Sequence, residues 1–214
     1  MKTLTYHACP FCEYRCKLFY KDKFRFYFKC ANCLTVFIHR DQLPDNESEK
    51  KRYLEHNNDV YDSYYRAFVK PIVDAVISNF SPADIGLDYG AGTGPVISEM
   101  LKENNYNIVK YDPFFLNFPE LLKNQYNYII CCEVIEHFHY PKNEFEYLIR
   151  MLLPGGKLFC MTEIYDESID FHRWYYKNDQ THVVFYHKKT FEWLKDKYNF
   201  ADLIINGRLI TFVA

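Results

Sequence analysis

The sequence predicts an α/β protein in which a small metal-binding module precedes a parallel sheet. Three observations carry this prediction. From residue 84 onward, strand-like and helical patterns alternate, which is typical of a parallel sheet flanked by helices. A turn with glycines at positions 90, 92 and 94 follows the first of these strands. Two CxxC pairs lie near the start of the chain, and a length of 214 residues suits one moderate domain with such a module.

The two CxxC pairs predict a zinc-ribbon-like module over residues 1–40. Cys9-Pro-Phe-Cys12 and Cys30-Ala-Asn-Cys33 are separated by 17 residues, a spacing that brings two tight knuckles around one tetrahedral ion. We expect structural zinc bound by the thiolates of Cys9, Cys12, Cys30 and Cys33, with Cys16 left over and His7 able to replace one ligand. No apolar leader or membrane-length run is visible, so we expect a cytoplasmic protein whose cysteines bind metal rather than form disulfides.

Positive charge is concentrated in the module. Residues 1–40 hold eight Lys or Arg and two acids, although the whole chain has a net charge of −2. Between Tyr14 and Lys29, basic residues alternate with aromatic ones, a pattern that suits phosphates and stacked bases of RNA. The alternative is a hairpin with one buried aromatic face and one solvated basic face.

Residues 41–80 are expected to form a helical linker. The stretch 41–52 is polar, and 60–79 has apolar and aromatic residues at helical spacing, with a kink or restart at Pro71. The main domain is then expected over 81–214. Its predicted strands are 84–89, 107–112, 126–132 and 157–162, its helices are 94–104, 141–153 and 189–198, a turn lies at 154–156, and a hairpin of strands 201–205 and 209–213 closes the chain around Asn206-Gly207.

The glycine turn narrows the class of ligand. A dinucleotide fingerprint would require glycine where Pro95 stands, and no phosphate-binding Gly-Lys-Ser/Thr is present. The pattern Asp88-x-Gly90-x-Gly92-x-Gly94 resembles the first motif of class I S-adenosylmethionine-dependent methyltransferases. Segments 126–138, 154–159 and 171–185 extend the resemblance over 84–213, and the joint pattern resembles a bacterial subgroup with an N-terminal CxxC…CxxC module. The resemblance implies a Rossmann-like class I methyltransferase sheet.

One strand of that sheet is expected to be missing. Only 13 residues separate Asp112 from Tyr126, where the family places a helix, a strand and another helix. A crossover alone needs about a dozen residues or more. Strand 107–112 would then be an exposed edge, and we expect the N-terminal segment to cover it.

The resemblance implies the cofactor-binding residues. The glycine turn would surround the methionine and ribose portions of S-adenosylmethionine, with Asp88 beneath the ammonium group and Glu133 near the methionine end. Asp112 ends the second strand and is expected to accept the ribose hydroxyls, the alternative being an Asp that caps a turn. The expected cofactor-binding set is Asp88, Tyr89, Gly90, Ala91, Gly92, Gly94, Asp112, Pro113 and Glu133.

Catalytic candidates are His137, His182 and Glu136. A base is needed only if the methyl acceptor must lose a proton, and an imidazole suits that role. Glu136 could orient an imidazole or act as the base. Aromatic faces stabilise a sulfonium cation, and the candidates for this, with ordinary core packing as the alternative, are Phe114, Phe115, Trp174 and Tyr175.

The predicted function is methyl transfer from S-adenosylmethionine to an unidentified small or medium-sized molecule. One alternative is an RNA methyltransferase whose basic, aromatic ribbon recruits the substrate. A second is a methyltransferase-like protein that binds a partner without catalysis. No membrane partner is expected, and the oligomeric state is left open.

Overall fold

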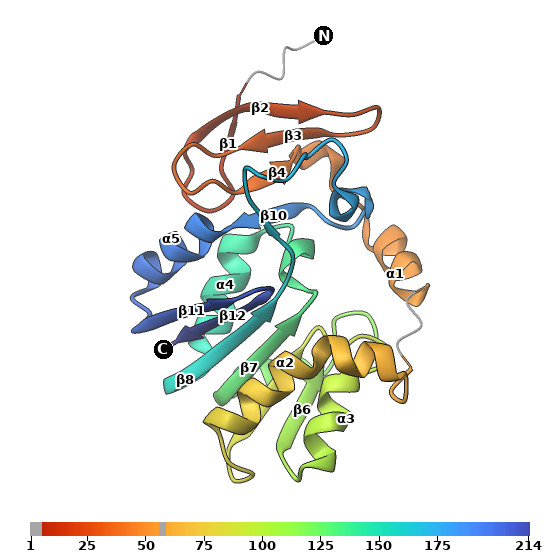
Figure 1. Cartoon of the computed structure of the whole chain (residues 1–214), viewed down its shortest axis with the longest axis vertical. Coiled ribbons are helices and arrows are strands. Elements are labelled where there is room, and N and C mark those ends of the chain that lie inside the picture. Colours follow the sequence, from red (N-terminus) through yellow and green to blue (C-terminus); the bar gives the residue numbers. More distant parts are fainter. Residues whose placement is uncertain (1–5, 56–58) are drawn as a thin grey trace.

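The computed structural model describes residues 6–55 and 59–214, which form two six-stranded sheets with helices around them (Figure 1). The first sheet has the order β1-β2-β3-β4-β10-β9, and the second has the order β11-β12-β8-β7-β5-β6. Within the described ranges, no helix is both long and apolar enough to cross a bilayer.

The second sheet is the predicted α/β core. Its parallel strands are β5 (Ile85–Tyr89), β6 (Asn107–Tyr111), β7 (Tyr126–Cys132) and β8 (Leu152–Met161). The hairpin of β11 (Asp202–Asn206) and β12 (Leu209–Val213) adds the antiparallel strands. The expected strands and the closing hairpin are therefore confirmed.

Alternate residues of each strand face two separate groups of helices, as the pleat requires. Tyr128 and Ile130 of β7 belong to a core with α2 (Ser63–Asn79) and α3 (Val96–Glu103). Ile129 and Cys131 belong to a second core with α4 (Pro141–Arg150) and α5 (Lys188–Tyr198). Both faces of the sheet are covered, which is the usual state of a parallel sheet.

The expected absence of a strand between β6 and β7 is confirmed. Between β6 and β7 the chain forms one isolated bridge, from Asp112 to Leu116, and a short 3₁₀ helix, η2 (Leu121–Lys123). β6 is accordingly an edge strand. We expected the N-terminal segment to cover this edge, and for the strands β1–β4 that expectation is wrong. They form a sheet with β10 at the opposite end of the molecule, where β4 pairs with β10 (Figure 1).

The N-terminal strands are built into a sheet with a much later part of the chain. β1 (Tyr6–Ala8), β2 (Arg15–Lys21), β3 (Phe26–Lys29) and β4 (Val36–Ile38) form an antiparallel meander. β10 (Val184–His187) pairs antiparallel with β4, and β9 (Ile164–Tyr165) pairs parallel with β10. Phe11, in the first CxxC pair, packs against Phe145, Tyr186 and Trp193, so the module and the main domain share one core.

Two local expectations are corrected. α2 runs through Pro71 as one helix, so the expected restart there is wrong, and the expected kink stays a prediction. Pro71 and Ala67, whose carbonyl loses its usual donor, both lie on the solvent side of the helix, so water can satisfy that carbonyl. The expected turn at 154–156 is a bulge within β8, since the register moves from Tyr126–Leu152 to Tyr128–Lys157.

Between the two sheets runs α1 (Asn46–Leu54), which follows the short 3₁₀ helix η1 (Arg40–Gln42). Asp45 caps α1 by accepting a hydrogen bond from the Ser48 N–H at 2.8 Å. Glu49 is the only residue of α1 that is buried. The helix therefore sits on the surface and contributes little to either core.

Candidate active site

A cavity of about 1660 Å³ lies at the carboxyl ends of β5, β6 and β7. It is larger than the roughly 300–1,000 Å³ of an ordinary ligand site. The glycine turn forms its floor, α1 contributes one wall, and residues 175–182 contribute another. Carboxyl ends of parallel strands are where α/β folds bind ligands. The cavity therefore has the place and the size for a cofactor with a second molecule.

The glycine turn is fixed by the strand beside it. The N–H of Gly90 donates to the Tyr111 carbonyl at 2.8 Å, and the N–H of Gly92 donates to Asp112 Oδ2 at 3.0 Å. Gly90 and Gly92 have φ of +83° and +62°. A Cβ on Gly90 would lie 2.5 Å from Val134 Cγ2, whereas one on Gly92 would meet nothing within 4 Å. Gly90 is required by packing, and Gly92 leaves open space on the cavity side.

Two aspartates support this turn from inside. Asp88 is buried and accepts a hydrogen bond from Ser98 Oγ at 2.7 Å, and burial raises its pKa to about 6. Asp112 Oδ1 accepts from the N–H groups of Phe114 and Phe115, at 2.8 and 3.1 Å. Asp112 thus caps the turn after β6 and also holds Gly92, and one acceptor position on Oδ2 has no partner among the described residues.

Glu133 is tied to an arginine that the sequence did not reveal. It has a left-handed backbone (φ 51°), and its carboxylate accepts two hydrogen bonds from Arg208 Nη2, at 2.7 and 2.6 Å. Burial and the nearby Glu136 raise the pKa of Glu133 to about 7, against the opposing effect of Arg208. Arg208 also pairs with Glu163. The only sequence signal for Arg208 is its place beside Gly207 in the predicted hairpin.

The structure brings the two candidate histidines together. Their ring centroids are 4.9 Å apart. His137 Nδ1 lies 2.9 Å from the Thr181 carbonyl, and His182 Nδ1 lies 2.7 Å from the Tyr176 carbonyl. Because a carbonyl only accepts, each Nδ1 must carry the proton, which leaves each Nε2 as an acceptor. Both residues line the cavity.

Both imidazoles are held neutral. Burial lowers the pKa of His137 below its usual value. Burial, and then the neighbouring His137, lower the pKa of His182 to about 3. Two neutral rings therefore offer proton-accepting Nε2 atoms at one end of the cavity.

Glu136 does not orient either imidazole through a direct hydrogen bond. Its side chain is fully buried, where it accepts hydrogen bonds from the Tyr176 hydroxyl and from Thr162 Oγ1. Burial raises its pKa to about 7, although the Tyr176 and Thr162 hydrogen bonds oppose this. Glu136 is not among the residues that line the cavity, although a carboxylate oxygen lies within 4.8 Å of a ring nitrogen of each histidine. Its expected role, to orient an imidazole or to act as the base, stays a prediction.

The aromatic candidates separate into two groups. Phe114, Phe115 and Tyr175 line the cavity. Trp174 is buried against Tyr165, Phe171 and Phe185, which is the ordinary core packing given above as the alternative role. No sequence pattern pointed to Tyr53 on α1, whose ring centroid lies 5.2 Å from that of His137 and 5.6 Å from that of Phe114.

Polar contacts hold α1 over the cavity. Arg52 donates to Asp179 Oδ2 from Nε and Nη2, at 3.0 and 2.9 Å, and His139 Nε2 lies 3.1 Å from Glu49 Oε1. Burial alone would raise the pKa of Asp179, but hydrogen bonds from Thr181 and Arg52 outweigh it and lower that pKa strongly. Residues 41–52 read as a polar linker, so no pattern in the sequence predicted this contact.

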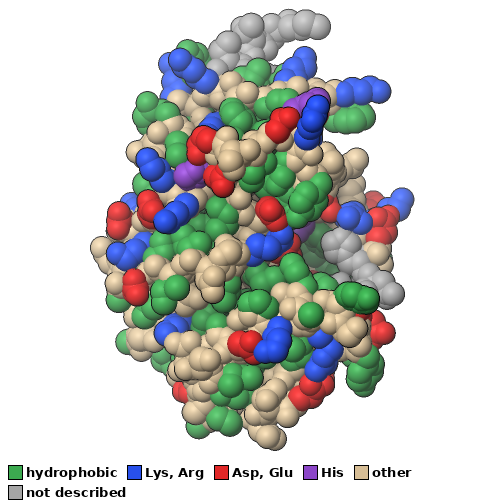
Figure 2. All heavy atoms as spheres, in the orientation of Figure 1, with side chains coloured by type: hydrophobic (Ala, Val, Ile, Leu, Met, Phe, Trp, Pro, Cys, Tyr) green, Lys and Arg blue, Asp and Glu red, His purple; other side chains and the backbone are tan. Residues whose placement is uncertain are grey.

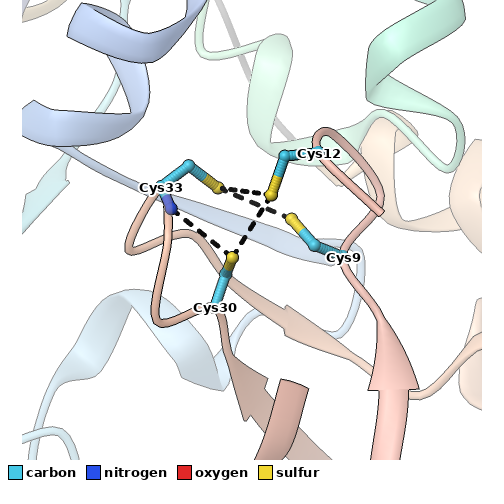
Figure 3. A group of neighbouring side chains, drawn as sticks. All are labelled: Cys9, Cys12, Cys30 and Cys33. Carbon is cyan, nitrogen blue, oxygen red and sulfur yellow. Dashed lines mark hydrogen bonds between the residues drawn. The ribbon is translucent and has the colours of Figure 1, made fainter. Parts of the chain in front are cut away.

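The four cysteines of the CxxC pairs converge at the edge of the first sheet, in the turns that follow β1 and β3 (Figure 3). The sulfur atoms of Cys9 and Cys33 are 3.5 Å apart, those of Cys12 and Cys30 are 3.4 Å apart, and those of Cys12 and Cys33 are 3.8 Å apart. Four thiolates at zinc–sulfur distances of about 2.3 Å in a tetrahedron would be separated by roughly 3.7 Å. The donor set therefore fits one zinc ion.

The two knuckles have the same backbone. Glu13 and Leu34, each directly after the second cysteine, have φ of 61° and 60°. Their N–H groups donate to the carbonyls of Cys9 and Cys30, at 3.0 and 3.1 Å. Cys16 does not join the cluster, and its thiol donates to the Tyr14 carbonyl. The cluster found among the described residues does not include His7 either.

The basic residues of the module have different surroundings. Lys and Arg side chains project from the end of the molecule that carries β2 and β3 (Figure 2). Arg15, Lys17, Lys21 and Lys23 are exposed. Arg25 instead donates to backbone carbonyls of residues 177–182, and Lys29 pairs with Glu167 at 2.7 Å. Part of the predicted basic surface is therefore used within the fold.

Comparisons with known proteins agree with this architecture. A protein-family model described as a methyltransferase domain matches residues 61–204. An O-methyltransferase family protein from Burkholderia thailandensis is 11% identical, with 79% of this chain and 67% of that chain covered at a TM-score of 0.51. Human N-acetylserotonin methyltransferase in complex with SAM is 14% identical over 78% of this chain and 64% of that chain, at a TM-score of 0.48. None of the curated proteins searched matches the chain. Because the family model covers more than half of the sequence, the chain belongs to the methyltransferase-domain family, as its class I motifs indicated.

Proposed function

We propose that this protein transfers a methyl group from S-adenosylmethionine to a hydroxyl group of a small or medium-sized molecule. The observation that carries the proposal is the pair of neutral imidazoles, His137 and His182, in the same cavity as the glycine turn. A hydroxyl is a poor nucleophile until its proton is removed, and a neutral imidazole removes such protons. The neighbour described as an O-methyltransferase is in keeping with an oxygen acceptor.

The cofactor would be held by the residues of the predicted set that line the cavity. Gly92 offers open space, Asp112 has one acceptor position left on Oδ2, and Asp88 and Glu133 supply carboxylates. S-adenosylmethionine supplies a methyl group on a positively charged sulfur, which makes that carbon an electrophile. Phe114, Phe115 and Tyr175 present aromatic faces to the cavity, and such faces stabilise a cation by up to about 2 kcal/mol.

The proposed step forms the acceptor O–CH₃ bond while the S–CH₃ bond breaks, and S-adenosylhomocysteine leaves with the electron pair. His137 Nε2 takes the hydroxyl proton, because its Nδ1–H is already fixed on the Thr181 carbonyl. His182 Nε2 is a second acceptor for a hydrogen bond from the substrate. Positioning of the two reactants would provide much of the acceleration.

Enclosure of the cavity by α1 favours a small acceptor over a nucleic acid. Residues 46–53 form part of the wall, and Arg52 ties them to Asp179. The RNA alternative has less support from the structure than from the sequence pattern of β2 and β3. Two of the basic residues in that pattern, Arg25 and Lys29, bind other parts of the protein. Retention on RNA that weakens with salt would favour that alternative.

We also propose that Cys9, Cys12, Cys30 and Cys33 bind a structural zinc ion. The sulfur separations and the four-thiolate donor set support it. The module of residues 1–40 would then be stabilised by the metal, the segment 41–80 would supply α1 and α2, and the methyltransferase domain would span 81–214.

Calorimetry and mass spectrometry test the proposal in sequence. The purified protein should bind S-adenosylmethionine, and incubation with a metabolite extract should produce a compound heavier by CH₂, because the methyl group replaces the hydroxyl proton. His137→Gln should retain cofactor binding and lose about 10²–10⁴-fold in rate. His172→Gln, at an exposed histidine outside the cavity, is the matched control. Absence of cofactor binding would instead favour a non-catalytic binding protein.

A further inference from the structure

The segment 175–182 holds both imidazoles in their orientation. The Tyr176 carbonyl accepts from His182 Nδ1 at 2.7 Å, and the Thr181 carbonyl accepts from His137 Nδ1 at 2.9 Å. Part of this segment is the short 3₁₀ helix η4 (Tyr175–Asn178), and the rest is an irregular loop. A loop with few regular hydrogen bonds needs other partners to stay in one conformation.

Arg25 provides those partners from the N-terminal module. Its Nη1 donates to the carbonyls of His182 and Gln180, at 3.0 and 3.3 Å. Its Nη2 donates to the carbonyl of Asp179 at 3.0 Å and to that of Lys177. One guanidinium thus gathers four carbonyls of a single loop, which its planar set of donors allows and a lysine ammonium does not.

The hairpin turn aims Arg25 at this loop. Asp22 Oδ1 accepts from the N–H groups of Phe24 and Arg25, both at 2.7 Å, and Asp22 Oδ2 accepts from the Tyr27 hydroxyl at 3.2 Å. The neighbours Lys21 and Lys23 are exposed, whereas Arg25 is half-buried. The turn therefore separates one inward-facing arginine from lysines that face the solvent.

A second arginine holds the same loop from the side of the cavity. Arg52 of α1 donates to Asp179 Oδ2. Asp179 Oδ1 accepts from the Thr181 N–H and hydroxyl, at 2.9 and 2.7 Å. Thr181 is the residue whose carbonyl fixes His137, so the two arginines hold this loop through its carbonyls and through a side chain.

We propose that Arg25 is a positioning residue of the acceptor site, so that the N-terminal module completes the site rather than recruiting an anionic partner with this arginine. The inference rests on the proposed function, because it assigns the imidazoles their role there. Its geometry does not depend on the identity of the acceptor. Without Arg25, the carbonyls of His182 and Gln180 lose the Arg25 hydrogen bond, and those of Asp179 and Lys177 keep only the weaker ones from the His182 N–H and the Tyr27 hydroxyl. The loop then no longer holds the Nδ1–H form of both rings.

Long-range ¹H–¹⁵N spectra of the metal-loaded protein report the tautomer of each histidine directly, and they require no methyl acceptor. The wild type should show His137 and His182 as Nδ1–H tautomers. His39 and His187 are internal references of the opposite tautomer, because their Nδ1 atoms accept from the N–H groups of Asp41 and Lys189. In Arg25→Gln, His182 should become a mixture of tautomers, and its pKa should rise, because the Arg25 charge is one of the groups that lower it.

Lys23→Gln is the matched control and should leave all four histidines unchanged. Calorimetry should show S-adenosylmethionine binding within twofold of wild type in both variants, so loss of binding in the wild type would count against the proposed function alone. If Arg25→Gln does not fold, Arg25→Lys replaces it and should show a smaller change at His182. A folded Arg25 variant with unaltered His137 and His182 signals would overturn the inference.

Discussion

Replacing Gly90 and Gly92 with alanine, one at a time, separates the stability of the turn from its proposed binding of the cofactor. Both have positive φ, a conformation that costs other residues roughly 1–2 kcal/mol. At Gly90 the new Cβ would also lie 2.5 and 2.9 Å from the two methyl groups of Val134. Overpacking typically adds about 1–3 kcal/mol. We therefore expect Gly90→Ala to lower the free energy of unfolding by about 2–5 kcal/mol, and Gly92→Ala by about 1–2 kcal/mol.

Cofactor binding is expected to follow the opposite order. A Cβ on Gly92 would meet no protein atom within 4 Å, so it occupies space that a ligand in the cavity would need. We expect Gly92→Ala to weaken S-adenosylmethionine binding by about tenfold or more, which corresponds to about 1.4 kcal/mol. Gly90→Ala, measured below its melting temperature, should bind more tightly than Gly92→Ala.

Urea denaturation and calorimetry provide the two measurements, and Val134→Ala provides the control. Shortening Val134 removes both methyl groups that the new Cβ would meet. The double variant Gly90→Ala/Val134→Ala should therefore show a favourable coupling of about 1 kcal/mol or more. Equal losses of stability at Gly90 and Gly92, or no coupling to Val134, would refute the packing argument.

Three further predictions concern other parts of the site. Asp112→Ala should weaken S-adenosylmethionine binding about tenfold in calorimetry, the effect of one charged hydrogen-bonding group; an unchanged Kd would remove Asp112 from the site. Removing the metal with a chelator should unfold β1–β4 and lower the melting temperature of the whole chain, because β4 pairs with β10; an ordered module without metal would contradict the zinc proposal. Burial raises the pKa of Glu136 from 4.5 to about 7, so the folded state keeps a proton that the unfolded state releases, and stability falls as pH rises from about 4.5 to 7. Urea titrations should show the free energy of unfolding of Glu136→Gln rising relative to that of wild type by up to about 3 kcal/mol between pH 5 and 8. A difference that does not change with pH would count against the raised pKa of Glu136.

The elements that local patterns define were predictable from the sequence. β5, the glycine turn and α3 follow from an apolar run, three glycines and a helical repeat. The absence of a full strand between Asp112 and Tyr126 followed from the 13 residues available where the family has a helix, a strand and another helix. The CxxC spacing brought four cysteines together correctly, because each knuckle is a local structure whose residues lie within a few positions.

The long-range contacts around the cavity were not predictable in the same way. Arg25, Arg52 and Arg208 each reach a partner distant in sequence, and a single charged residue leaves no periodic pattern that names its partner. Glu136 shared its motif with His137 but points to Thr162 and the Tyr176 hydroxyl instead of the cavity. The sequence pointed to residues around the cavity, and tertiary packing decided which of them line it.

The pairing of β4 with β10 has a consequence for how the chain is made. β4 ends at Ile38 and its partner β10 begins at Val184, so β4 leaves the ribosome well before the strand with which it pairs. At roughly 5–20 residues per second, this interval lasts about 7 to 30 seconds. During it, β4 is an open edge on which another strand can add. The nascent chain must therefore avoid such pairing until β10 has been synthesised and covers this edge of β4.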